Sequence, residues 1–243
     1  MGGPGGGVYN GRVRRILTTE WLDLGGATYP EVVDDMLQIR WFNRYCGGAR
    51  ALLTHLDRLI EQDGPASSLS LLDVATGSAD LPLRIVRWAA RRGLDVRIAA
   101  LDRHPEVLRF ARAETRTFPQ VGLIQADARD LPVRRASCDY ALSSLFLHQL
   151  DEASGTALLR RLLEVSKRAV LINDLVRHAL HYAGAWTLAR CLTRNPITRN
   201  DAPASVRNAY TVKELRELGR ASGASRVEVF RHAPFRACLV LRP

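Results

Sequence analysis

Three apolar runs in the sequence each deliver an acidic residue to a position where a strand would end. Residues 71–80 read Leu-Leu-Asp-Val-Ala-Thr-Gly-Ser-Ala-Asp, Asp102 closes the run 96–102, and Asp127 closes the run 121–127. In an open α/β sheet, ligands bind at the carboxyl ends of the strands. A carboxylate at such an end can accept hydrogen bonds from both hydroxyls of a ribose. The spacing therefore predicts a site for a nucleoside-shaped ligand.

The turn at residues 75–79 argues against a dinucleotide as that ligand. It holds one glycine, Gly77, whereas a pyrophosphate-binding fingerprint needs three. Asp80 opens the helix predicted to follow, and its negative charge opposes a phosphate at a helix N-terminus. A cation such as a sulfonium is favoured there.

The segment 143–148 leaves the fourth predicted strand and would lie beside the reactive end. Its last residue, His148, is our candidate for a group that deprotonates or orients an acceptor hydroxyl, because histidine is the commonest positioned base near neutral pH. Packing or helix capping is the other interpretation of His148.

Other candidate groups lie farther along the chain. His178 and His181 are not at i, i+4 spacing, so we expect no metal site, and one of them could line an acceptor pocket. Arg199 could clamp a carboxylate or phenolate on the acceptor, although simple solvation explains it as well. In the N-terminal helices, Arg40, Asn43 and Arg44 could close over a bound ligand, or could lie on a surface helix.

The elements that must position these groups alternate between strand and helix. This alternation, with strands of nearly continuous apolar character, predicts a mostly parallel sheet covered on both faces. Two final strands with no helix between them suit an antiparallel hairpin at the sheet edge. The predicted strands are 69–74, 97–101, 121–125, 138–143, 169–173, 226–231 and 236–242; the predicted helices are 80–92, 105–117, 152–166, 176–192 and 211–219, with a polar loop at 193–210.

Composition limits the alternatives. The 243 residues carry a net charge of +10, but only two are lysines and the arginines are scattered, which argues against a nucleic-acid footprint. The four cysteines form no CxxC pair, so reduced thiols in the cytoplasm are expected. No signal peptide and no apolar run of membrane-spanning length is present, so we predict no stable membrane insertion and at most peripheral contact.

The domain organisation follows from these patterns. We expect a disordered head at 1–17, a helical N-terminal cap at 18–66, and one catalytic domain at 67–243. Within that domain, residues 174–210 form an inserted helix-loop that would cap the substrate.

Together, the motifs resemble those of class I S-adenosylmethionine-dependent methyltransferases. Residues 72–80 correspond to that family's glycine-rich turn, Asp102 to its ribose-binding acid, Asp127 to its adenine-side acid, and 138–148 to its motif-four strand. The resemblance covers about residues 68–174 and the closing hairpin. It implies a Rossmann-like α/β fold with a seven-stranded sheet.

The resemblance also implies which residues hold the cofactor, S-adenosyl-L-methionine, with S-adenosyl-L-homocysteine as product. Ala75 and Ala79 stand at two family glycines, and Ala75 is tolerable if its φ is negative. The implied cofactor-binding residues are Asp73, Ala75, Thr76, Gly77, Ser78, Asp80, Asp102, Arg103, Asp127, Ala128, Ser144 and Leu145.

Segments outside the core motifs are similar to those of quinone-biosynthesis and natural-product enzymes of this class. They lead us to expect methyl transfer to a small aromatic or polyketide-like acceptor in secondary metabolism, more at oxygen than at carbon, with His148, His178 and Arg199 as candidate catalytic residues. Alternatives are C-methylation of a lipid quinone, nucleic-acid methylation, or a non-catalytic cofactor-binding protein. The expected oligomeric state is a monomer or homodimer.

Overall fold

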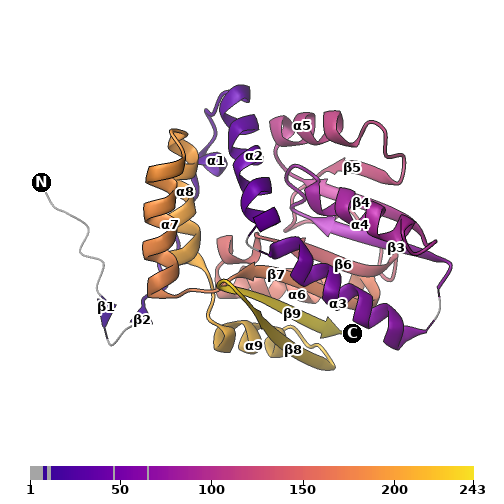
Figure 1. Cartoon of the computed structure of the whole chain (residues 1–243). Helices are drawn as coiled ribbons and strands as arrows, with labels where there is room; N and C mark the ends of the chain where they lie inside the picture. The colour runs from indigo at the N-terminus through magenta and orange to yellow at the C-terminus, as the bar shows by residue number, and fades with distance from the viewer. Residues whose placement is uncertain (1–7, 10–11, 46, 65) are drawn as a thin grey trace, which may run out of the picture.

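Seven strands form one sheet in the order β5-β4-β3-β6-β7-β9-β8 (Figure 1). The computed structural model describes residues 8–9, 12–45, 47–64 and 66–243. The first five strands of the sheet are parallel, whereas β9 runs antiparallel to both β7 and β8. The strands are β3 (Ser68–Val74), β4 (Asp95–Asp102), β5 (Val121–Gln125), β6 (Cys138–Ser144), β7 (Ser166–Leu175), β8 (Arg226–His232) and β9 (Arg236–Arg242).

This topology confirms the predicted fold class. The chain crosses from β3 outward to β4 and β5 and then returns to β6 on the other side of β3. At such a switch point the loops diverge and leave a crevice beyond the strand ends. The strands are apolar along their length because both faces are covered, and Leu71, Leu72 and Val74 of β3 are all buried.

Helices cover both faces of the sheet. On one face, α3 (Gly48–Asp63) packs its leucines against β7 and β9, and α4 (Asp80–Ala90) packs its leucines and isoleucine against β4. On the other face, α6 (Glu152–Val165) and α9 (Val212–Ala221) pack against β6, β7 and β9. Only part of the predicted N-terminal cap at 18–66 therefore lies outside the layers that cover the sheet, because α3 packs on the sheet itself.

The remaining helices stand beyond the carboxyl ends of the strands (Figure 1). They are α1 (Trp21–Leu24), α2 (Tyr29–Tyr45), α7 (Ala179–Leu192) and α8 (Pro196–Asn208), and α2 also packs on α5 (Pro105–Thr115). A short 3₁₀ helix, Leu147–Gln149, follows β6.

The predicted polar loop at 193–210 is wrong, because most of it is the helix α8. The Asn195 side chain accepts a hydrogen bond from the Ile197 backbone N–H, and Pro196 occupies the first turn, where it costs no hydrogen bond. Pro203 inside the helix, together with the polar composition, hid this element from the sequence analysis.

The predicted disordered head falls partly outside the described residues. Residues 1–7, 10 and 11 are not described, while β1 (Val8–Tyr9) and β2 (Arg12–Val13) pair as a small hairpin. The segment that follows is attached to the body of the protein, because Arg15 donates to the backbone oxygens of Leu150 and Asn208 at 2.6 and 2.7 Å.

Among the described residues, no helix has the length and apolar character to span a membrane.

The contact between α9 and the C-terminal hairpin provides a test of the packing. A Cβ added at Gly219 would lie 2.7 Å from Val227 Cγ1 and 3.0 Å from Leu241 Cδ2, whereas one at Gly184 of α7 would meet nothing within 4 Å. We expect Gly219→Ala to lower the free energy of unfolding by about 1–3 kcal/mol through overpacking. Gly184→Ala should raise it by up to about 1 kcal/mol through helix propensity. Urea denaturation of both variants measures this, and equal effects would contradict the packing described.

Candidate active site

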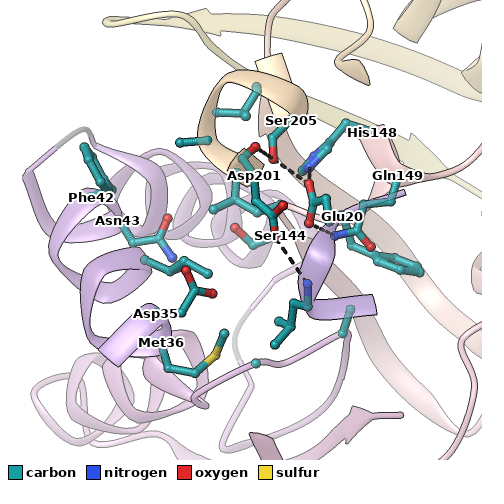
Figure 2. A pocket seen from close by; sticks show the side chains of 18 of the residues that line it. Glu20, Asp35, Met36, Phe42, Asn43, Ser144, His148, Gln149, Asp201 and Ser205 are labelled. Carbon is teal, nitrogen blue, oxygen red and sulfur yellow. Dashed lines mark hydrogen bonds and ion pairs between the residues drawn. The ribbon is translucent and has the colours of Figure 1, made fainter. Parts of the chain in front are cut away.

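One cavity of about 570 Å³ lies at the switch point, between the strand ends and the helices α1, α2, α7 and α8 (Figure 2). Its lower wall comes from the turns after β3, β4, β5 and β6. Its upper wall comes from the cap helices. Among the described residues that line it, eight are Asp or Glu, three are Arg and none is Lys, so acidic groups outnumber basic ones there although the chain has a net charge of +10. Such a cavity favours a cation.

The turn after β3 is held by the carboxyl group that precedes it. Asp73 is buried, and Thr76 Oγ1 donates to its Oδ2 at 2.7 Å. Burial, with the neighbouring carboxylates of Asp80 and Asp102, raises the pKa of Asp73 to about 7.

Ala75, Gly77 and Ala79 all have positive φ values, of 57°, 56° and 58°. The condition under which Ala75 was expected to be tolerated, a negative φ, is therefore not met. An L-residue in this left-handed region is strained because its Cβ crowds the following carbonyl. The alanines thus occupy a backbone conformation that glycine adopts more easily.

Asp102 at the end of β4 ties two loops together. Its Oδ2 accepts from the Gly77 backbone N–H at 2.9 Å, and its Oδ1 accepts from the His104 N–H at 3.0 Å. It is buried at the cavity wall. Each carboxylate oxygen retains a second lone pair, so these bonds leave acceptor capacity toward the cavity.

Asp127 at the end of the β5 segment also lines the cavity but is paired. Arg129 Nη2 and Nε donate to its two oxygens at 2.6 and 3.0 Å. Hydrogen bonds from Arg129 lower the pKa of Asp127 to about 2, so the carboxylate stays ionised.

Asp80 provides an unsatisfied acceptor at the same wall. It is nine-tenths buried, and burial raises its pKa. Its Oδ2 has no hydrogen-bond partner among the described residues, and the nearest cation recorded for it, Arg84 Nε, is 4.0 Å away. A buried acceptor of this kind fits a ligand that brings its own donor, such as an ammonium group.

His148 lies between two carboxylates, of which Glu20 is drawn in Figure 2. Its Nδ1 lies 2.7 Å from Asp174 Oδ1 at the end of β7, and its Nε2 lies 3.2 Å from Glu20 Oε1. Burial alone would lower the pKa of His148, but the carboxylates of Asp174 and Glu20 raise it to about 10. At neutral pH His148 is therefore an imidazolium with both N–H groups used, and it cannot serve as the predicted base without a change of partner.

Glu20 comes from the segment before α1, and its carboxylate accepts hydrogen bonds from several side chains. Gln149 Nε2 donates to its Oε2 at 2.6 Å, and Ser205 Oγ of α8 donates to its Oε1. The cap is held in the same way by Asp201 of α8, which accepts from the backbone N–H groups of Trp21 and Leu22 at 2.9 and 3.3 Å. These bonds fix α1 against α8.

The structure brings most of the predicted site residues together. All the cofactor-binding residues named above line the cavity, and so does His148. His178 and Arg199 do not: His178 caps α7 and stacks on Phe235, and Arg199 donates to the backbone oxygens of Thr193 and Arg190. Their predicted catalytic roles have no support in their positions, because neither side chain lies at the cavity.

Only one of the residues of the N-terminal helices that were predicted to close over a ligand lies at the cavity. Asn43 lines the cavity, but Arg40 forms an ion pair with Glu114 of α5 and lies outside it. Glu20, Asp35 and Asp201 were missed. For Asp35 a signal existed, since it shares the helical face of Val32 and Met36 and is therefore a carboxyl group on an apolar face.

Within the described residues, no group of three or more His, Cys, Asp or Glu side chains could hold a metal ion.

Comparisons with known proteins agree with this arrangement. Residues 71–169 match the family model described as a methyltransferase domain. No curated protein sequence matches the chain significantly. Among solved structures, human N-acetylserotonin methyltransferase in complex with S-adenosylmethionine superposes with a TM-score of 0.65 at 15% identity, over 88% of this chain and 56% of that one.

Two further structures are similar. PigF with S-adenosylhomocysteine gives a TM-score of 0.60 at 16% identity, over 93% of this chain and 63% of that one. A SAM-dependent methyltransferase from Aquifex aeolicus gives 0.55 at 16% identity, over 76% and 87%. The chain thus spans less than two thirds of the human enzyme and of PigF.

Residues 71–169 match a methyltransferase domain, and the chain has the fold of class I S-adenosylmethionine-dependent methyltransferases, as its motifs predict. This domain implies S-adenosylmethionine as the methyl donor.

The strained turn offers a direct test. Ala75→Gly removes a Cβ from a residue with a φ of 57°, so we expect the free energy of unfolding to rise by about 0.5–1 kcal/mol despite the greater freedom of glycine in the unfolded chain. Ala157→Gly, at an exposed position in the interior of α6, should lower it by about 0.5–1 kcal/mol. Denaturant titration of both variants provides the comparison. Destabilisation by Ala75→Gly would contradict the strain.

Proposed function

We propose that the protein transfers a methyl group from S-adenosylmethionine to a hydroxyl group of a small aromatic or polyketide-like acceptor. The observation that carries this proposal is that one cavity joins the predicted cofactor residues to His148 and the cap. A nucleoside-shaped ligand along the strand ends and a small acceptor under the cap would share this space.

The residues at the strand ends fit the cofactor. Asp102 has lone pairs for the ribose hydroxyls, Asp127 and Ala128 lie where an adenine edge would be held, and Asp80 Oδ2 is free to accept from an ammonium group. When bound, S-adenosylmethionine supplies an electrophilic methyl group on a positively charged sulfur. The negative wall of the cavity stabilises that charge before transfer.

The cap would hold the acceptor and exclude water. Leu180 and Leu188 of α7, Val206 of α8 and Phe235 line the cavity and offer an apolar surface for an aromatic ring. Holding the acceptor oxygen in line with the methyl group is the main requirement, since well-oriented reactants gain about 7–11 kcal/mol relative to free ones. His148 contributes by fixing Glu20 and the 3₁₀ turn in place.

Asp102→Ala tests the cofactor assignment. The change removes the acceptor for ribose and the anchor of the Gly77 N–H, so we expect the Kd for S-adenosylhomocysteine to rise about 10–100-fold. Isothermal titration calorimetry measures it. Asp95→Asn, at the exposed opposite end of β4, is the matched control and should leave the Kd unchanged. An unaltered Kd for Asp102→Ala would refute the ribose assignment.

His148→Ala tests the acceptor side. Without the imidazolium, Glu20 and Asp174 lose their common partner, and displacement of the turn that holds the acceptor should lower kcat for methylation of simple phenols by about 10²-fold. The Kd for S-adenosylhomocysteine should stay within about twofold, which also shows that the variant is folded. Lys213→Ala, at an exposed position of α9 outside the cavity, should match the wild type. Full turnover by His148→Ala would contradict a role of His148 in positioning the acceptor.

A further inference from the structure

Asp35 on α2 is a buried carboxyl group that the motifs do not account for. It is 4% exposed, lines the cavity, and lies on the inner face of α2 (Figure 2). The next residue, Met36, lies over the turn after β3, with its Sδ 3.8 Å from the position of a Cβ at Gly77. Asp35 therefore sits above the predicted cofactor turn, on the side of the cap.

The hydrogen bonding of Asp35 leaves one oxygen open. Thr198 Oγ1 of α8 donates to Asp35 Oδ1 at 2.7 Å. Among the described residues, no hydrogen bond is made to Asp35 Oδ2. A carboxylate oxygen left open at a cavity wall is a natural acceptor for a ligand's hydroxyl group, since burial without a partner is costly.

The surroundings of Asp35 make it able to gain and lose a proton near neutral pH. Burial raises its pKa, the Thr198 hydrogen bond lowers it, and the carboxylates of Asp201, Glu20 and Asp34 raise it further, to about 7. These groups come from α8, from the segment before α1, and from α2 itself. A general base works best when its pKa lies near the working pH.

His148 differs from Asp35 in its hydrogen bonding and in its protonation. Both of its ring nitrogens face carboxylates, and it keeps its proton at neutral pH. Of the two groups, Asp35 is the one with an open acceptor atom.

We infer that Asp35 accepts the proton of a phenolic hydroxyl group on the acceptor, and that His148 is a positioning residue. This inference rests on the proposed function. As the acceptor O–H bond breaks, its proton bonds to Asp35 Oδ2, and the freed electron pair forms the bond between oxygen and the methyl carbon. The carbon–sulfur bond breaks, and its pair stays on sulfur, which becomes neutral. The proton leaves Asp35 for solvent after the methyl ether departs.

The kinetic test is the pH profile of methyl transfer to resorcinol and catechol. In the wild type, the rate should rise with pH through about 7 and then level off, because only ionised Asp35 accepts the proton. Asp35→Asn should lower kcat by about 10²–10⁴-fold and abolish this rise. Thr198→Val should move the rise to higher pH, because it removes the hydrogen bond that lowers the pKa of Asp35.

Asp34→Asn is the matched control. Asp34 is the adjacent carboxylate on α2, but it is exposed and accepts from Gln38 and Asn195 instead of facing the cavity. This variant loses the same charge and should keep the rate and a rise with pH, moved slightly to lower pH because one of the carboxylates that raise the pKa of Asp35 is gone.

A second readout does not depend on turnover. Resorcinol should bind the complex with S-adenosylhomocysteine about fivefold more tightly at pH 8 than at pH 5.5, because a charge-assisted hydrogen bond to ionised Asp35 is stronger than a neutral one. Calorimetry should show this dependence in the wild type and in Asp34→Asn, and none in Asp35→Asn.

The outcomes separate this inference from the proposed function. An Asp35→Asn variant that keeps the wild-type profile and the pH-dependent binding overturns the role of Asp35. So does a protein that binds S-adenosylhomocysteine but methylates neither phenol. Failure to bind S-adenosylhomocysteine at all instead overturns the proposed function.

Discussion

The buried imidazolium of His148 joins the two halves of the cavity. Asp174 belongs to the sheet, Glu20 belongs to the segment that leads into the cap, and His148 bonds to both. Removing one member of such a chain leaves an uncompensated buried charge, which is strongly destabilising. The cap is therefore held against the strand ends at one defined place, and the width of the cavity follows from that attachment.

The attachment extends through α8. Glu20 accepts from Ser205, Asp201 binds the first N–H groups of α1, and Asn208 exchanges hydrogen bonds with the backbone of Thr18. The segment before α1 is thus attached by hydrogen bonds both to the sheet, through His148, and to α8. It also brings carboxylates close together, which is what tunes the proton affinity of Asp35.

The sequence predicted the sheet and the lower wall because each depends on local signals. A parallel strand buried on both faces is apolar throughout, and the acidic residues at β4 and β5 follow such strands directly. The turn after β3 was located correctly, but the positive φ of Ala75 could not be foreseen, because the surrounding fold imposes a conformation that alanine does not prefer.

The upper wall could not be predicted in the same way. Glu20, Asp35 and Asp201 lie far apart in the chain and meet only through helix packing, and α8 was hidden by Pro203. His148 was correctly placed at the cavity, yet its chemistry depends on Glu20, a partner 128 residues away. The identity of a site residue can thus be read locally, whereas its protonation depends on distant neighbours.

A crystal structure of the protein with S-adenosylhomocysteine is the most direct test of this account. We predict that the ribose hydroxyls bond to Asp102, that the amino group lies at Asp80, and that the sulfur faces a space bounded by Asp35 and His148. A nucleoside bound elsewhere, or a sulfur atom pointing away from the cap, would contradict the central claim that the strand ends and the cap form one reaction chamber.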